Sequence, residues 1–191
     1  MMKNRKTYKY LFVLVVMVVV AAGLRNYREF QRGAVLRQRN DREFRRASTI
    51  ENAFAIRNVE TGMGIRVYGS DVENQIRIVH YTCNYWQCMT WQFIQLEENI
   101  FLLRNLFTHK NFQPSSLPEP GITLWQQTLD GNTYQRWEFL QQADETYLMR
   151  LQGTELYFTA TSDENNSDIT LMPLQNSAMQ QWMLIRQQPI F

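Results

Sequence analysis

The chain contains few of the residues that carry most enzyme chemistry and most special backbone conformations. Its 191 residues include two histidines, two cysteines, eight glycines and five prolines. The low glycine and proline contents exclude collagen-like and low-complexity chains. The sequence also has no G-x-S-x-G, P-loop or G-x-G-x-x-G motif, and its histidines, His80 and His109, occupy unrelated positions. We therefore expect a protein without catalytic activity and without a cofactor.

Cysteine is limited to Cys83 and Cys88, so only one pairing exists. The four residues between them fit a hairpin clip, and in an oxidising compartment we expect a disulfide that shapes this loop. A C-x4-C pair with only two histidines elsewhere is not a convincing zinc ligand set. The sequence therefore predicts no metal site.

No uncharged apolar run reaches the ~20 residues that span a bilayer comfortably. The run at residues 10–24 follows a basic N-terminus and ends in small residues, which is typical of a secretory signal peptide. Arg25 and Arg28 follow at once, which favours a retained membrane anchor. Residues 1–24 are thus a signal peptide or an anchor. The rest of the chain is expected to be secreted, periplasmic or at the cell surface, or else anchored with its folded part outside.

Charge is distributed unevenly along the chain. Residues 1–47 carry 12 basic and 3 acidic side chains, whereas the remainder carries 8 basic and 15 acidic ones. An acidic body is repelled by phosphate backbones, so we expect no binding to nucleic acid. Residues 25–50 form an arginine-rich arm or linker with one basic helical stripe. This segment is either a contact for a lipid surface or partner, or a solvated stalk.

Three sets of residues recur with a period of about 46 residues. The sets are Trp91, Trp137 and Trp182; Arg57, Arg104 and Arg150; and Ile76, Ile122 and Ile169. Each period contains four short apolar stretches, several of them alternating with period two, which is typical of half-buried strands. Three units of four strands predict threefold closure, because closure removes exposed sheet edges. The periodic tryptophans are expected to fill the common core.

The sequences around these tryptophans resemble the Q-x-W signature of the ricin-B β-trefoils. They read QRW at 135–137 and QQW at 180–182, while MTW at 89–91 keeps the tryptophan and lacks the glutamine. The resemblance implies an all-β fold for residues 51–191, a β-trefoil of three four-stranded repeats of ~46 residues. A hydrophobic helix and the basic arm would precede it.

The resemblance also implies a place for a sugar. Pockets in that family combine an Asp after the second strand, an aromatic residue on the third strand and an Asn before the Q-x-W. Only the second repeat has the aromatic residue, Trp125, because Val79 and Met172 take this position in the other repeats. The implied pocket consists of Asn111, Trp125 and Gln135. The competing interpretation is that Trp125 covers the edge of the core and Gln135 satisfies a backbone group.

A second resemblance is carried by IRNVETG at residues 56–62, which follows a long tail. This segment is similar to the first repeat of the accessory A and C subunits of cytolethal distending toxins. Those proteins are also ricin-like trefoils, and they bind the cell surface as partners of a nuclease subunit. The resemblance implies a cell-binding role with partner toxin subunits.

One aromatic cluster, Tyr81, Tyr85 and Trp86, lies outside the repeat pattern. It predicts either a protein-interaction surface or a small core that closes its own hairpin. Two functions therefore remain open. The first is a non-catalytic recognition module for a cell-surface glycan, glycoconjugate or glycosylated receptor. The alternative is a membrane-anchored assembly protein, held by residues 10–24, whose trefoil docks other proteins without binding sugar.

Overall fold

A computed structural model describes residues 52–142 and 144–187 of the chain, and these residues form an all-β domain. The strands are β1 (Ala53–Asn58), β2 (Gly64–Val67), β3 (Ile78–Tyr81), β4 (Trp91–Gln95), β5 (Ile100–Asn105), β6 (Asn111–Pro114), β7 (Leu124–Gln127), β8 (Trp137–Gln141), β9 (Tyr147–Leu151), β10 (Tyr157–Ala160), β11 (Ile169–Met172) and β12 (Gln181–Arg186). The 3-10 helices are η1 (Tyr68–Ser70), η2 (Gln87–Met89), η3 (Thr133–Gln135) and η4 (Ala178–Gln180). The predicted twelve strands are confirmed.

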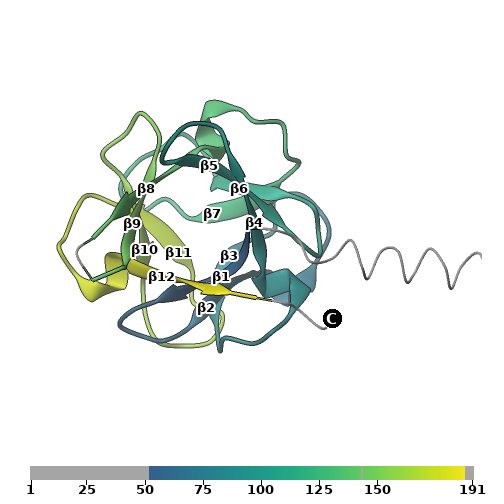
Figure 1. Cartoon of the computed structure of the whole chain (residues 1–191). Coiled ribbons are helices and arrows are strands. Elements are labelled where there is room, and N and C mark those ends of the chain that lie inside the picture. Colours follow the sequence, from purple (N-terminus) through teal and green to yellow (C-terminus); the bar gives the residue numbers. More distant parts are fainter. Residues whose placement is uncertain (1–51, 143, 188–191) are drawn as a thin grey trace, which may run out of the picture. The chain divides into compact units, whose positions relative to one another are not determined.

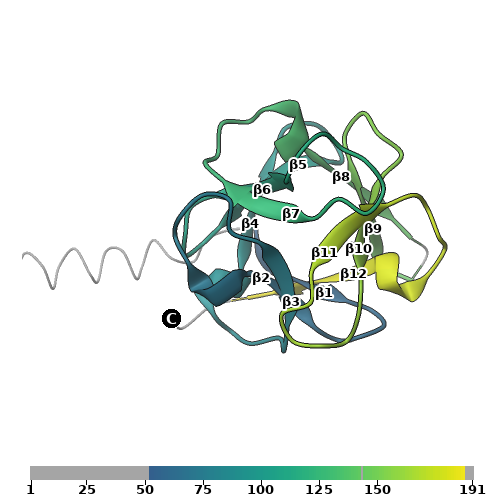
Figure 2. The ribbon, with the colours of Figure 1, turned by 180° about the vertical axis from the view of Figure 1, so that it is seen from behind.

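The strands form three lobes, β1–β4, β5–β8 and β9–β12, which we call lobes one, two and three. The first and fourth strands of the lobes pair in a closed ring, in the order β1–β4–β5–β8–β9–β12 and back to β1. Figure 1 shows these strands around the centre of the molecule. The second and third strands of each lobe form a hairpin, and the third strands face the viewer in Figure 2.

The hairpins meet through three isolated bridges, one between each pair of lobes: Arg77 with Trp125, Thr123 with Thr170, and Asp168 with Val79. The first and last of these bridges are linked by an ion pair, in which the Arg77 guanidinium donates to Asp168 at 2.6 Å. The threefold closure predicted from the repeats is therefore present both in the barrel and in the hairpins.

The three periodic tryptophans have the same environment in each lobe. Their side chains are fully buried, and each indole N–H donates to a backbone carbonyl of the second strand of its own lobe. The donor–acceptor pairs are Trp91 to Ile65 (3.4 Å), Trp137 to Phe112 (3.4 Å) and Trp182 to Phe158 (2.9 Å). Burial of one such ring is worth roughly 2–3 kcal/mol, so these residues are structural.

The three periodic isoleucines, Ile76, Ile122 and Ile169, do not occupy equivalent positions in the three lobes. Ile169 lies opposite the last residue of β10, and the residues in the matching places of lobes one and two are Ile78 and Leu124. Ile76 and Ile122 lie two residues earlier in their lobes. Because side chains on a strand alternate with period two, a shift of two residues leaves each one on the same face. The sequence pattern does not reveal such a shift.

The predicted hydrophobic helix within residues 1–24 and the basic arm at residues 25–50 lie outside the described residues. Within residues 52–187, leaving aside residue 143, no helix has the length and apolar character needed to span a membrane.

Candidate functional site

Gln135, at the end of η3, is fully buried and holds the loop that precedes it. Its Oε1 accepts from the backbone N–H groups of Asp130 and Gly131, both at 3.1 Å. Its Nε2 donates to the Thr128 carbonyl at 2.8 Å and to the Gln113 side chain at 3.1 Å. All the ordinary hydrogen-bonding groups of this amide are therefore used inside the protein, as one of the two interpretations of Gln135 predicted.

Asn111, at the start of β6, is also fully buried. Its Nδ2 donates to the Gln135 carbonyl at 2.9 Å, and its Oδ1 accepts from the Phe112 backbone N–H at 2.7 Å. The predicted direct contact of Asn111 and Gln135 with a sugar is therefore corrected, because neither side chain has surface that a ligand could touch. Both residues position the loop above them instead.

Trp125 is the member of the predicted pocket that remains partly exposed. It pairs across the β6–β7 hairpin with Gln113, so the two side chains share one face of the hairpin. The Gln113 side chain also accepts from Asn132 Nδ2 at 3.4 Å, and Asp130 Oδ1 accepts from the same nitrogen at 2.8 Å. An indole, two amides and a carboxylate thus form a connected polar surface in lobe two, which we call the lobe-two face.

Sequence reasoning missed Gln113, Asp130 and Asn132. The feature of the sequence that could have identified Asp130 and Asn132 is the Asp-Gly-Asn turn at residues 130–132. This turn lies directly before the 3-10 helix that carries the Q-x-W glutamine. This turn places a short amide and a carboxylate where Gln135 anchors the backbone. An Asp or Asn in such a turn also bonds its own backbone, as Asp130 does to the Asn132 N–H at 3.0 Å.

The other two lobes have no equivalent of the Trp125 ring. The register of the hairpins places Val79 at this position in lobe one, and Val79 is fully buried. In lobe three the position belongs to Thr170, not Met172, because of the same two-residue shift that affects Ile169. The prediction that only lobe two carries an aromatic residue here is confirmed.

In the aromatic cluster of lobe one, Tyr81 and Trp86 pack together and Tyr85 is exposed on the surface. The Tyr81 ring lies 3.7 Å from the Arg66 guanidinium and 6.1 Å, between ring centres, from Trp86. Tyr85 is different, because 62% of its surface is exposed. Each of the two predicted interpretations therefore describes some members of this cluster.

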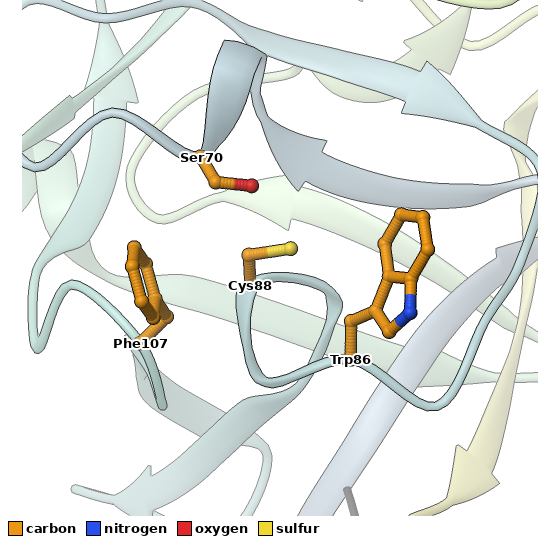
Figure 3. A pocket seen from close by; sticks show the side chains of 4 residues that line it. All are labelled: Ser70, Trp86, Cys88 and Phe107. Carbon is orange, nitrogen blue, oxygen red and sulfur yellow. The ribbon is translucent and has the colours of Figure 1, made fainter. Parts of the chain in front are cut away.

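Trp86 also lines a shallow pocket of about 200 Å³, together with Ser70, Cys88 and Phe107. Figure 3 shows the rings of Trp86 and Phe107 on opposite sides, with the Cys88 side chain between them and the Ser70 hydroxyl at the edge. Phe107 is 43% exposed. Ser70 and Phe107 were missed because they come from two other loops, and only the fold brings these loops beside residues 86–88.

The predicted disulfide is wrong, because Cys83 and Cys88 are both free thiols. The two side chains have separate neighbours. The Cys83 sulfur lies over Gly64 of β2, 3.3 Å from the place where a Cβ would be, and burial raises the pKa of its thiol although Arg57 opposes the shift. Cys88 is buried in η2, with its side chain in the pocket.

His80 is buried in β3, and its Nδ1 lies 3.2 Å from the Ser162 carbonyl. Among the residues that the structure describes, its Nε2 has no hydrogen-bond partner, and burial lowers the pKa of the ring. In the part of the chain that the structure describes, no three His, Cys, Asp or Glu residues are grouped as a metal site would require. The sites that remain are the lobe-two face and the pocket beside Trp86.

No protein-family model matches this chain, and no curated protein matches it in sequence. Solved structures do match it. A designed threefold-symmetric protein, ThreeFoil, is 14% identical with a TM-score of 0.69, and the match covers 71% of this chain and 99% of that one. The chain has the β-trefoil fold. A ricin B-like lectin from Macrolepiota procera, solved with lactose, matches this trefoil at 16% identity and a TM-score of 0.60, over 70% of this chain and 94% of the lectin.

The trefoil is also similar in fold to cytolethal distending toxin from Actinobacillus actinomycetemcomitans. This match has 13% identity and a TM-score of 0.60, and covers 74% of this chain and 94% of the matched chain. Both resemblances seen in the sequence are therefore present in the structure. At these identities they establish the fold, and the ligand has to be argued from the surface of this trefoil.

Proposed function

We propose that this trefoil is a non-catalytic recognition module that binds a carbohydrate on the lobe-two face. The observation that carries the proposal is the partly exposed Trp125 ring, which shares a hairpin face with Gln113, whose side chain is hydrogen-bonded to Asn132 and through it to Asp130. An exposed ring stacks on the apolar face of a sugar, while amides and a carboxylate bond its hydroxyl groups. The fold it shares with lectins supports this use of the surface.

In this proposal, Asn111 and Gln135 are positioning residues. Gln135 fixes the backbone at residues 128–131, and Asn111 fixes the backbone of Gln135. The ligand contacts come from residues above them. The binding surface is shallow, so we expect weak binding to a single sugar and stronger binding to a multivalent glycoconjugate.

The test is a glycan array with the full chain, followed by titration of a glycan that binds. Trp125→Ala is expected to weaken binding by about tenfold, because it removes the stacking surface of a central contact. Asn132→Ala should also weaken binding. Leu117→Ala is the matched control, because Leu117 is 75% exposed in the turn of the same hairpin and lies outside the lobe-two face.

Each variant is first compared with the wild type by thermal unfolding, so that loss of fold is separated from loss of binding. A chain that is folded and binds no glycan on the array contradicts the proposal. Equal affinity of Trp125→Ala and the wild type for the glycan would move the site away from the lobe-two face.

We further propose that the module is presented outside the cell, secreted or at the surface, as the cell-binding subunit of a multi-subunit toxin. The support is the fold shared with cytolethal distending toxin and the predicted export segment at residues 1–24. Sequencing of the mature N-terminus tests the export part. A cleaved product favours a soluble toxin subunit, and a retained segment favours a membrane-anchored assembly protein.

The second candidate function is protein docking without sugar, and the pocket between Trp86 and Phe107 favours it. The lining of this pocket is almost entirely apolar, and its Phe107 side chain is 43% exposed; Tyr85, next to Trp86 in the chain, is also exposed. Exposed aromatic residues beside a pocket are typical of the centres of protein interfaces. A negative glycan array, with a partner whose binding is lost in Phe107→Ala and kept in Trp125→Ala, would favour this function.

A further inference from the structure

A larger pocket, about 660 Å³ in volume, lies on a different part of the molecule from both candidate sites. It opens between the β4–β5 turn and the ends of β8 and β9, and all four strands belong to the closed ring in Figure 1. Its lining residues are Glu98, Asn99, Phe101, Phe139, Leu140, Gln141 and Tyr147. None of these residues belongs to a hairpin that carries the lobe-two face.

The apolar wall of this pocket is aromatic and well packed. The Phe139 ring is almost completely buried, and its centre lies 5.6 Å from that of Phe101 and 6.1 Å from that of Tyr147. Phe101 and Tyr147 are only partly buried, so part of each remains exposed to solvent. The pocket therefore presents firmly held aromatic rings, which are suited to stacking with a planar group.

The polar wall of the pocket consists of one carboxylate, Glu98, two amides, Asn99 and Gln141, and one phenol, Tyr147, and none of the lining residues is basic. Glu98 is exposed at the rim, and among the described residues its carboxylate takes part in no ion pair and accepts no hydrogen bond. The hydroxyl of Tyr147 and the side-chain amide of Gln141 likewise have no partner in the part of the chain that the structure describes. A ligand that donates several hydrogen bonds and carries positive charge would satisfy this wall.

Two acidic turns flank the pocket and add to its negative potential. The β4–β5 turn contains Glu97 and Glu98, and the β8–β9 turn contains Asp144 and Glu145. The Thr146 side chain and backbone hold the pKa of the Asp144 carboxyl below its ordinary value, so this group is charged at neutral pH. Across residues 52–187 the chain has eight basic and fourteen acidic residues, which favours a basic partner overall.

We propose that this pocket binds an arginine side chain from a basic segment of a partner polypeptide. The guanidinium would stack on the Phe101 and Tyr147 rings and donate to the Glu98 carboxylate. The protein already contains the same chemistry internally, because the Arg66 guanidinium lies 3.7 Å from the centre of the Tyr81 ring and that of Arg77 lies 4.9 Å from the centre of the Tyr68 ring. Arginine is favoured over lysine because its planar, weakly hydrated head group stacks and also bonds a carboxylate with two parallel donors.

The test uses the full chain and a short fluorescent peptide with two arginines separated by neutral residues, measured by fluorescence anisotropy at low and physiological salt. A second peptide replaces both arginines with citrulline, which keeps the planar shape and removes the charge. We expect the arginine peptide to bind in the high-micromolar to millimolar range. The citrulline peptide should bind at least about tenfold more weakly. A third peptide, with lysine in place of both arginines, should have an affinity between those of the other two.

The variants divide the site into its charged and aromatic parts. Glu98→Gln keeps the shape and is expected to weaken arginine binding by about threefold to fivefold, with a smaller dependence on salt. Phe101→Leu should weaken it by a similar factor with the salt dependence unchanged, because it removes an aromatic face and no charge. Glu119→Gln is the matched control, since it removes an exposed carboxylate from the β6–β7 turn, which does not line the pocket.

Equal binding of the arginine and citrulline peptides would overturn the proposal. It would also be overturned if Glu119→Gln reduced binding as much as Glu98→Gln, since the attraction would then be the net charge of the whole domain. Failure of the lobe-two glycan proposal leaves these measurements unaffected, because no residue is shared between the two sites.

Discussion

Lobes one and two have different side chains at the position two residues before the core tryptophan. In lobe two, Gln135 precedes the core tryptophan by two residues and bonds two backbone N–H groups, a carbonyl and Gln113. In lobe one the same place belongs to Met89, which is fully buried. The end of its side chain lies 2.9 Å from the place where Gly64 would carry a Cβ.

The difference also extends to the surrounding residues. Gly64 is the lobe-one counterpart of Asn111, and Arg66 is the counterpart of Gln113. Where lobe one has a thioether in place of the buried amide, the neighbouring position has no side chain, and the Met89 methyl group lies next to it. The two lobes therefore show that the Q-x-W glutamine holds the loop before it, whereas the tryptophan keeps its buried place in the core with or without that glutamine. Lobe three resembles lobe two, since Gln180 bonds Gln175, Pro173 and Thr159.

The largest effect is expected from placing the lobe-one residue in lobe two. Gln135→Met removes the acceptor of the part-buried backbone N–H groups of Asp130 and Gly131, and each group left unsatisfied costs about 1–3 kcal/mol. We expect the free energy of unfolding, measured in urea, to fall by about 2–4 kcal/mol. Met89→Leu, an apolar exchange at the matching position, should cost less than about 1.5 kcal/mol. A loss below about 1 kcal/mol for Gln135→Met would show that water replaces the amide.

A smaller effect is expected from Gly64→Ala, which tests the coupling between Gly64 and Met89. The added methyl group would lie too close to the Met89 methyl carbon and to the Cys83 sulfur, at 2.9 and 3.3 Å. We expect a loss of about 1–2 kcal/mol in the wild type. In a Met89→Ala background the same substitution should cost less, because only the contact with the Cys83 sulfur then remains. Equal costs in both backgrounds, measured by urea unfolding, would contradict this packing argument.

The next comparison is between His80 in lobe one and Gln126 in lobe two, which occupy matching places in their hairpins. Burial lowers the pKa of His80, so the folded protein holds the ring neutral while the unfolded chain protonates it near pH ~6.5. Stability should therefore fall as the pH drops through this value, because the unfolded state binds the proton more tightly. In His80→Gln this part of the pH dependence should disappear. An unchanged slope of stability between pH 7 and pH 5.5 would show that other groups cause it.

The smallest effect is expected at the bridges between hairpins, where an ion pair links only lobes one and three. The side chains of Arg77 and Asp168 are 42% and 33% exposed, so solvent screens their attraction. Asp168→Asn should lower the free energy of unfolding by about 0.5 kcal/mol, and less in high salt. Thr123→Ala, at the matching place in lobe two, has no ion pair to lose and provides the comparison. A salt-independent loss would assign the effect to packing.

Much of the fold could be predicted from the chain alone. The spacing of Trp91, Trp137 and Trp182 identified the three units, because each tryptophan must fill the same place in a shared core. The two complete Q-x-W sequences then pointed to a trefoil that resembles the ricin-B type. The error of two residues at Ile169 arose because strand alternation repeats every two residues, and only the pairing with β10 determines the register.

The candidate sites depended much more on the tertiary structure. Trp125 was found from its place in the repeat, but the sequence does not show whether Asn111 and Gln135 face a ligand or the protein. That choice depends on backbone groups of a loop that fold against the two side chains. The cysteine pair likewise has a spacing that permits a disulfide, whereas in the structure both thiols are free, with Cys83 packed on Gly64 of β2 and Cys88 lining the pocket.

The sequence by itself determined the number of lobes, the three tryptophans at the centre of the core and the one lobe with an aromatic residue at the Trp125 position, because these follow from periodicity and residue type. Only the tertiary structure decided which polar side chains are buried and hydrogen-bonded within the protein. It also decided which loops meet to form the pockets at Phe107 and Glu98. The physical reason is that a pocket consists of residues distant in the chain. Their meeting depends on threefold closure, which no local pattern encodes.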